Sequence, residues 1–220
     1  MAFVIYHLMI HLAMDKCALV FTGGKAPKAP FENSLIPECD FICAADSGLD
    51  TATSLGFSVD TAIGDFDSLK DHSLLEKIEV LKLPKAKDVS DTEALLQLIN
   101  EKGYSSYILI GGGEGRFDHL LSLYFLFAKY GPPKIWFTAS EILYLVEGKK
   151  EFKGVLNKTV SIIPALFNGF SKVKSSGLKW ELDNFTISGT SQSLSNVIIN
   201  EKLSLIVTKS PVFVSFPFVI

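Results

Sequence analysis

The sequence has little of what marks several common protein classes. Its three cysteines, Cys17, Cys39 and Cys43, are an odd number without CxxC spacing. A disulfide scaffold or a zinc site is therefore not indicated, and such thiols fit a reducing cytoplasm. The net charge is only −3, so the chain lacks the basic excess typical of nucleic-acid-binding proteins. No apolar run is long enough to cross a bilayer as a helix. We expect a cytoplasmic protein with no nucleic-acid partner and no membrane association.

The composition favours a folded, globular chain. Of its 220 residues, 48% are hydrophobic and 20% are charged, which is enough apolar material for one large domain or two small ones. Residues 1–15 have no Lys or Arg before their apolar run and no small-residue cleavage pattern. We therefore expect them to form an N-terminal extension, with Met14 as the working start, and not a signal peptide.

Two patterns of hydrophobicity divide the rest of the chain. Residues 16–138 alternate short apolar runs with helical periodicity, which predicts a parallel-sheet, Rossmann-like α/β domain. The expected strands are Cys17–Gly23, Phe41–Asp46, Thr61–Asp65, Val80–Pro84, Tyr107–Gly111 and Ile135–Thr138, and the expected helices are Ser47–Gly56, Ser68–Lys77, Asp91–Lys102 and Phe117–Tyr130. Residues 139–220 contain only short β-rich runs separated by Gly, Asn, Ser and Lys, which predicts an all-β sandwich domain. Its expected strands are Val160–Ile163, Trp180–Leu182, Phe185–Ile187, Val197–Ile199, Leu203–Thr208 and Val212–Phe216.

Two carboxylates spaced two residues apart follow the expected strand that begins at Thr61. On an extended backbone Asp65 and Asp67 point the same way, about 6.5–7 Å apart, while Phe66 points toward the core. A hard divalent cation such as Mg²⁺ would relieve the repulsion between them. An acidic turn at a strand end is the alternative interpretation.

Other polar residues follow or precede expected elements. Asp46, Ser47 and Gly48 come after a strand and open a helix, so they fit either a helix cap or a phosphate site. Ser90 and the residue three positions later, Glu93, form a capping box, which places Asp91 in the first helical turn. Asp88 precedes that cap and is predicted to be either exposed or a ligand.

The only arginine of the chain, Arg116, follows a loop with four glycines in five residues, Gly111 to Gly115. Lysine supplies every other basic charge, so this position favours a site that needs the planar, bidentate guanidinium for phosphate. A structural ion pair with Asp118 or Glu114 is the alternative.

Six motifs in order resemble those of the thiamine pyrophosphokinase family. They are AADSGLD at 44–50, GDFDSL at 64–69, KDVSDTE at 87–93, GGGEGRFDHLL at 111–121, GLKWEL at 177–182 and SQSLSN at 191–196. Each motif alone is modest, but together they cover the chain from about residue 17 to its end. Ser90 stands where the family more often has threonine, which preserves the hydroxyl.

The resemblance implies transfer of a pyrophosphoryl group from ATP to the hydroxyl of thiamine, with Mg²⁺, by a homodimer whose active sites lie between subunits. It implies that Mg²⁺ is held by Asp46, Asp65, Asp67 and Asp91, and that Asp65, Asp67, Asp91 and Arg116 are catalytic. The implied nucleotide-side residues are Asp46, Ser47, Gly48, Asp88, Ser90, Gly112, Arg116 and Asp118, and the implied thiamine-side residues are Trp180, Ser195 and Asn196.

Two other functions fit the same residues. The carboxylates and the glycine loop would serve another Mg²⁺-dependent nucleotide-phosphate transferase, and a non-catalytic nucleotide or thiamine sensor would use the same binding groups. Trp180 could stack on a planar cationic ring or simply belong to the core. The proton acceptor for the thiamine hydroxyl could be either Asp91 or Asp67.

Overall fold

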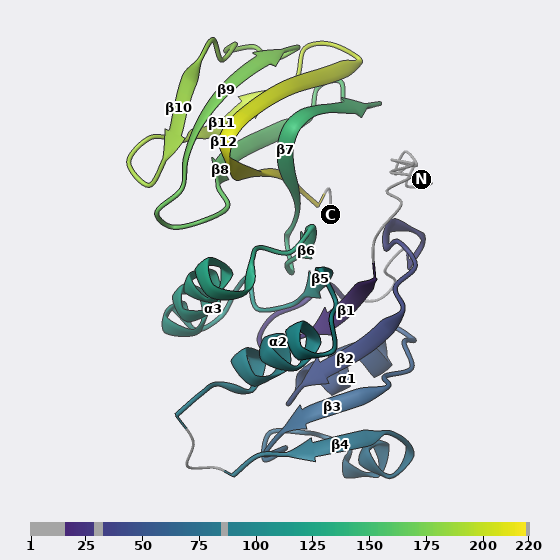
Figure 1. Cartoon of the computed structure of the whole chain (residues 1–220). Coiled ribbons are helices and arrows are strands. Elements are labelled where there is room, and N and C mark those ends of the chain that lie inside the picture. Colours follow the sequence, from purple (N-terminus) through teal and green to yellow (C-terminus); the bar gives the residue numbers. More distant parts are fainter. Residues whose placement is uncertain (1–15, 29–32, 85–87, 219–220) are drawn as a thin grey trace. The chain divides into compact units, whose positions relative to one another are not determined.

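The computed structural model describes residues 16–28, 33–84 and 88–218. The expected N-terminal extension, 1–15, lies outside the described residues. The chain divides into two compact units, one ending at Glu141 and the other beginning at Ile142 (Figure 1). The first contains helices and strands, and the second contains only strands and loops among its described residues.

The first unit is built on a sheet of six parallel strands in the order β6-β5-β1-β2-β3-β4. Their bounds are Cys17–Phe21 (β1), Phe41–Ala45 (β2), Thr61–Gly64 (β3), Glu79–Lys82 (β4), Ser106–Ile110 (β5) and Ile135–Phe137 (β6). The central strands β1 and β5 are apolar and almost fully buried, as expected for strands covered on both faces. The strand order reverses between β1 and β5, which is where ligands bind in open α/β sheets.

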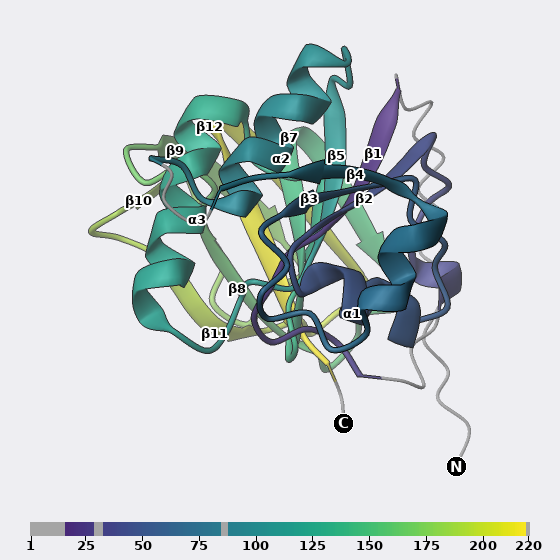
Figure 2. The same cartoon turned by 90° about the horizontal axis from the view of Figure 1, so that it is seen from below.

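Within the described ranges, three α-helices cover the sheet: α1 (Gly48–Ser54), α2 (Asp91–Glu101) and α3 (Phe117–Tyr130). Figures 1 and 2 show α2 and α3 on one face and α1 on the other. The α-helix expected at Ser68–Lys77 is wrong, because that segment forms a 3-10 helix, η2, over His72–Lys77. The Asp71 side chain caps η2 by accepting from the Ser73 backbone N, and none of the η2 residues is buried. Without an apolar face to bury, little favours a longer helix here.

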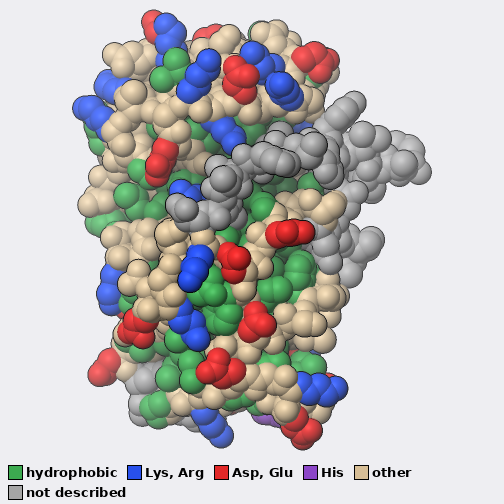
Figure 3. All heavy atoms as spheres, turned by 45° about the vertical axis from the view of Figure 1, so that its right-hand side comes forward, with side chains coloured by type: hydrophobic (Ala, Val, Ile, Leu, Met, Phe, Trp, Pro, Cys, Tyr) green, Lys and Arg blue, Asp and Glu red, His purple; other side chains and the backbone are tan. Residues whose placement is uncertain are grey.

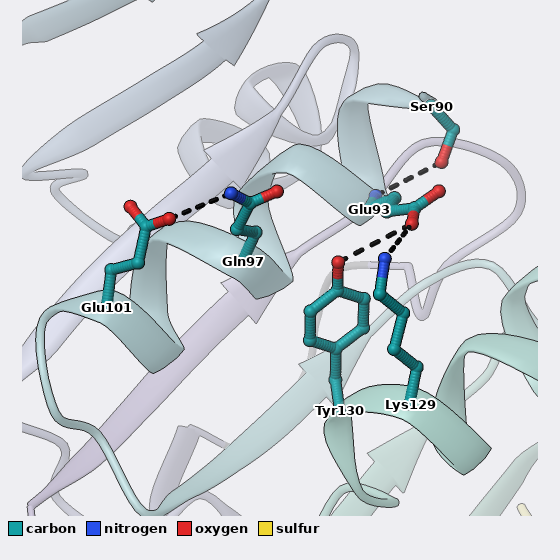
Figure 4. Close-up of polar contacts among 6 residues, drawn as sticks. All are labelled: Ser90, Glu93, Gln97, Glu101, Lys129 and Tyr130. Atoms are coloured by element: carbon teal, nitrogen blue, oxygen red, sulfur yellow. Dashed lines mark hydrogen bonds and ion pairs between the residues drawn. The ribbon is translucent and has the colours of Figure 1, made fainter. Parts of the chain in front are cut away.

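The start of α2 is capped and linked to the end of α3 (Figure 4). The Ser90 hydroxyl accepts a hydrogen bond of 3.1 Å from the Glu93 backbone N, which is the expected N-cap. The Glu93 carboxylate accepts from Lys129 Nζ at 2.9 Å and from the Tyr130 hydroxyl at 3.4 Å. An acid in the first turn of α2 thus meets a base in the last turn of α3, and each charge also complements its own helix dipole.

The second unit wraps strands around one apolar core that includes Phe152, Ile162, Val173, Ile187 and Val214. Its strands are Glu141–Lys153 (β7), Thr159–Pro164 (β8), Phe170–Ser176 (β9), Phe185–Ser188 (β10), Ser193–Val197 (β11) and Lys202–Pro217 (β12). β12 pairs antiparallel with β9 through its first half and with β8 through its second half. Between the halves, Lys209 has a positive φ of 77°, so the strand changes direction there.

Several strand predictions in this unit are wrong. The segments Leu203–Thr208 and Val212–Phe216 are expected as separate strands but belong to the single strand β12. Trp180–Leu182 is not a strand but part of a loop. The pattern also missed β7 and β9, whose sequences mix lysines and other polar residues with the buried positions.

Charge on the molecular surface is mixed. On the face shown in Figure 3, acidic and basic side chains alternate without a continuous basic area. Among the described residues, no helix has the length and hydrophobicity needed to cross a bilayer.

Candidate functional site

The carboxyl ends of the parallel strands carry the polar residues that the sequence singled out. Asp46 directly follows β2, Asp65 follows β3, and the glycine loop follows β5. Backbone hydrogen bonds continue from these strands into the loops: Asp46 N donates to Ile63 O at 3.0 Å, and Thr22 N donates to Ile110 O at 3.0 Å. The loops therefore leave the sheet from fixed positions at one edge.

Three of the expected metal ligands lie together. Asp46, Asp65 and Asp67 each offer a carboxylate oxygen, and these oxygens lie within 4.8 Å of one another. The extended backbone expected for this pair is wrong, because Phe66 has a φ of 59°. Phe66 itself is buried, at 2% exposed, while the carboxylates on either side of it face the same group. The Asp67 backbone N also donates to Asp65 Oδ1 at 3.1 Å, which steadies the turn.

Asp46 is held in an unusual conformation for a non-glycine residue, with a φ of 47°. The Ser68 hydroxyl donates to its Oδ2, whereas its Oδ1 is buried and has no hydrogen-bond partner in the described structure. A buried carboxylate oxygen without a partner is costly unless another group contacts it. An all-oxygen donor set that includes such an atom fits a hard cation such as Mg²⁺.

The remaining expected ligand, Asp91, is not part of this three-carboxylate group in the described structure. It is the first residue of α2, next to the N-cap Ser90. The neighbouring Thr92 hydroxyl is 2.5 Å from the Thr22 hydroxyl, and this contact ties the start of α2 to the end of β1. Asp88 lies in an exposed bend before the cap.

Ser47 occupies the N-cap position of α1, but its side chain makes no capping hydrogen bond there. Gly48 packs tightly against the end of β1, because a Cβ at this position would lie 2.5 Å from Phe21 O. Glycine is therefore required for α1 to approach the strand so closely.

Arg116 forms an ion pair with Asp118, which was the alternative interpretation of this residue from the sequence. Its Nε donates to Asp118 Oδ1 at 3.1 Å and its Nη2 donates to Asp118 Oδ2 at 2.5 Å. The guanidinium holds the pKa of the Asp118 carboxyl below its ordinary value, and the same hydrogen bonds raise the pKa of Arg116. Both side chains are mostly exposed, at 72% and 63%, so the pair contributes little to stability. It does orient the guanidinium at the N-terminus of α3.

The glycine loop lies against the loop that follows β1. Gly111 and Gly112 have φ values of 95° and 73°, and Trp136 Nε1 donates to Gly111 O at 2.7 Å. On the facing loop, Lys25 Nζ is 3.7 Å from a carboxylate oxygen of Glu114, and the Lys25 backbone N donates to Glu114 O at 3.3 Å. Sequence reasoning missed Lys25, although its place after Thr22-Gly23-Gly24 at a strand end is a signal that could have found it.

In the second unit, Trp180 lies in a loop between β9 and β10 and is 56% exposed. The core interpretation of this residue is therefore wrong. Lys179 Nζ lies 4.6 Å from the centroid of the indole ring, so a cation already rests against it. The contact is a cation–π interaction between neighbouring residues.

Asn196 holds the Trp180 backbone from β11. Its Oδ1 accepts from Trp180 N at 3.2 Å and from Val197 N at 2.9 Å, and its Nδ2 donates to Trp180 O at 2.8 Å and to Ser193 Oγ at 3.3 Å. Asn196 is only 2% exposed. Ser195 is exposed, with a φ of 52°, and its backbone N donates to Ser161 Oγ at 3.0 Å.

Comparison with known families gives two matches along the chain. Residues 33–136 match the model of the thiamin pyrophosphokinase catalytic domain, and residues 146–213 match that of the thiamin pyrophosphokinase vitamin B1 binding domain. Together the matches cover more than half of the chain. No curated protein sequence matches it.

Solved structures with a similar fold include a thiamine pyrophosphokinase from Bacillus subtilis, with 20% identity and a TM-score of 0.71 over 92% of this chain and 99% of that one. A thiamin pyrophosphokinase from Geobacillus thermodenitrificans has 23% identity and a TM-score of 0.70 over 91% and 97% of the two chains. The enzyme from Candida albicans has 17% identity and a TM-score of 0.68 over 92% and 89%. At these identities the structures establish the shared mixed α/β fold.

Proposed function

Because the chain belongs to the thiamin pyrophosphokinase family, we propose that it transfers the pyrophosphoryl group of ATP to the hydroxyl of thiamine, giving thiamine diphosphate and AMP. Thiamine pyrophosphokinase activity follows from the family, whereas the donor, the metal and the residue roles are proposals. The observation that carries them is the group of three carboxylates, Asp46, Asp65 and Asp67, at the carboxyl edge of a parallel sheet.

Asp46, Asp65 and Asp67 would hold Mg²⁺. The buried, unpartnered Oδ1 of Asp46 supports this proposal, because a cation would satisfy it. Bound there, Mg²⁺ would neutralise charge on the phosphates during transfer. We retain Asp91 as a further acidic ligand or phosphate-side residue, since the hydrogen bond between Thr22 and Thr92 fixes the start of its helix.

On the nucleotide side, Arg116 would exchange its bidentate contact with Asp118 for a phosphate. The exposure of this pair supports the exchange, since little stability is lost when it opens. The nucleotide would also be contacted by residues of the loops and helix starts at this edge, namely Ser47, Gly48, Ser90 and Gly112. Asp88 would lie near them. The strand-order reversal between β1 and β5 supports a Rossmann-like site at this edge.

In the transfer, the thiamine hydroxyl oxygen forms a bond to the β-phosphorus of ATP. The bond from the β-phosphorus to the oxygen that bridges the α- and β-phosphates breaks at the same time. AMP leaves, and the hydroxyl proton passes to a carboxylate, Asp91 or Asp67. Most of the rate enhancement in such reactions comes from positioning and charge neutralisation. Trp180 and Ser195, in the β-sandwich that we propose for the second unit, would bind thiamine.

We further propose a cytoplasmic homodimer with active sites between subunits. Its three cysteines are free, which fits a reducing compartment. Light scattering after size-exclusion chromatography measures the assembly state, and a monomer would contradict the dimer.

The direct test incubates the protein with ATP, MgCl₂ and thiamine and measures AMP and thiamine diphosphate. We expect equal amounts of both products, and neither when EDTA is added. If ADP and thiamine monophosphate form instead, the proposed transfer of a whole pyrophosphoryl group is wrong. If thiamine is untouched while another alcohol is consumed, the substrate assignment is wrong.

A further inference from the structure

The loop that carries Trp180 is organised around the neighbouring carboxylate of Glu181. Glu181 Oε1 accepts from the backbone N of Gly177 at 2.6 Å and from that of Leu178 at 3.1 Å. Its Oε2 accepts from the Ser175 hydroxyl, whose oxygen in turn accepts from Leu182 N at 2.7 Å. One exposed side chain therefore joins the beginning of the loop to its end.

The backbone of this loop is also hydrogen-bonded to β11 and to the segment that follows β11. Lys179 N donates to Val197 O at 2.7 Å, and Ile199 N donates to Gly177 O at 2.9 Å. Gly177 has a φ of 110°, and a Cβ there would lie 2.5 Å from Lys202 O. The loop therefore has one well-defined place on the second unit.

Asn196 completes the arrangement from the other side of Trp180. Both of its accepted and both of its donated hydrogen bonds go to protein groups, which uses the full capacity of a side-chain amide. Asn196 therefore has no polar capacity left for a ligand. The Asn196 side chain holds the backbone of Trp180 in place.

We infer that Glu181 is a positioning residue for thiamine binding: it holds the loop of residues 177–182 so that the exposed Trp180 ring is fixed before the planar cationic ligand arrives. This inference rests on the proposed function. A loop ordered in advance binds more tightly, because less conformational entropy is lost on binding. Glu181 does not itself touch the ligand, so its loss weakens thiamine binding and leaves nucleotide binding unchanged.

The test compares Glu181→Ala with Glu181→Gln, which retains an oxygen that can accept from the Gly177 and Leu178 backbone N–H groups. Glu201→Ala, at an exposed glutamate of the same unit, is the matched control. Thermal melting establishes that each variant is folded. Steady-state kinetics give KM separately for thiamine and for ATP. Thiamine binding is also followed by tryptophan fluorescence. The only other tryptophan, Trp136, is buried, so the part of the fluorescence change that is lost in Trp180→Phe comes from Trp180.

We expect Glu181→Ala to raise KM for thiamine by about fivefold, because the variant loses ordinary hydrogen bonds. The thiamine concentration that gives half of the fluorescence change is expected to rise by the same factor. Glu181→Gln and Glu201→Ala stay within about twofold of wild type, and kcat and KM for ATP do not change. An equal rise in KM for both substrates, or no change in Glu181→Ala, overturns the inference.

The fluorescence measurement needs no ATP, so it separates this inference from the proposed function. A thiamine response that depends on Glu181 in a protein that forms no thiamine diphosphate supports the inference and contradicts the proposed function. Product formation without any Trp180 response to thiamine supports the function and overturns the inference.

Discussion

Asp67→Asn removes one negative charge from the three-carboxylate group while keeping the size of the side chain. Because the carboxylate oxygens of this group lie within 4.8 Å of one another, two unit charges there repel by about 0.9 kcal/mol in a medium like water and by about 3.5 kcal/mol at an effective dielectric constant of 20. Asp67 is exposed, so the lower figure applies to each of its two neighbours. Without metal, the variant is therefore expected to be more stable than wild type by about 1–2 kcal/mol.

The catalytic effect has the opposite sign. Loss of a metal ligand and of its charge is expected to lower kcat by a factor of about 100 or more, since a bound metal contributes several kcal/mol to charge stabilisation. The assay measures the melting temperature with EDTA and with increasing MgCl₂, together with the rate of AMP formation. In EDTA the variant melts about 2–6 °C above wild type, whereas MgCl₂ raises the melting temperature of wild type much more than that of the variant.

Asp183→Asn is the matched control, because it makes the same charge change at a side chain that is 88% exposed in the other unit and whose ion pair with Lys174 Nζ, at 3.8 Å, contributes little. It is expected to behave as wild type in both measurements. If Asp67→Asn keeps its turnover and its full response to MgCl₂, the assignment of a metal site to this group is wrong. If it loses turnover but melts below wild type in EDTA, the repulsion between the carboxylates is not what the geometry implies.

Three other predictions concern different parts of the molecule. Arg116→Lys keeps the charge but loses the bidentate fork, so KM for ATP is expected to rise about tenfold in steady-state kinetics; an unchanged value would remove Arg116 from the nucleotide site. Gly48→Ala forces a Cβ to within 2.5 Å of Phe21 O and is expected to lower the free energy of unfolding in urea by about 1–3 kcal/mol, whereas Gly189→Ala, whose Cβ has no neighbour closer than 3.5 Å, should change it little. Burial raises the pKa of the Cys43 thiol, so its contribution to stability is full below the ordinary thiol pKa and is lost as the pH rises above it. The stability advantage of wild type over Cys43→Ala is expected to shrink by about 1.4 kcal/mol between pH 7 and pH 10, and a constant difference would contradict this.

The sequence predicted the parallel sheet of the first unit well, because all of its strands except the edge strand β4 are apolar, mostly buried runs bounded by clear turn signals. β1, for example, is fully buried along its length. The capping hydroxyl of Ser90 and the glycine that ends α2, Gly103 with a φ of 79°, were also predictable, since both are local features.

The local geometry of the candidate site could not be predicted, because it depends on contacts between distant segments. Asp46 and Phe66 both have left-handed backbone conformations. They lie in loops after neighbouring strands whose backbones approach closely, because a Cβ on Gly64 would lie only 3.3 Å from Asp46. Similarly, Leu203–Thr208 and Val212–Phe216 were expected as two strands, but β12 continues through both by changing its partner from β9 to β8.

The ion pair between Arg116 and Asp118 also bears on which molecules the loop can select. In the described structure the guanidinium already holds a carboxylate through both of its oxygens, so an incoming ligand has to compete with an anion that is always present at high local concentration. A neutral nucleoside has no negative charge with which to displace Asp118 from the guanidinium, whereas a polyphosphate brings several negative charges at once. If Arg116 binds phosphate as we propose, Asp118 would therefore act as a competing anion that disfavours uncharged ligands.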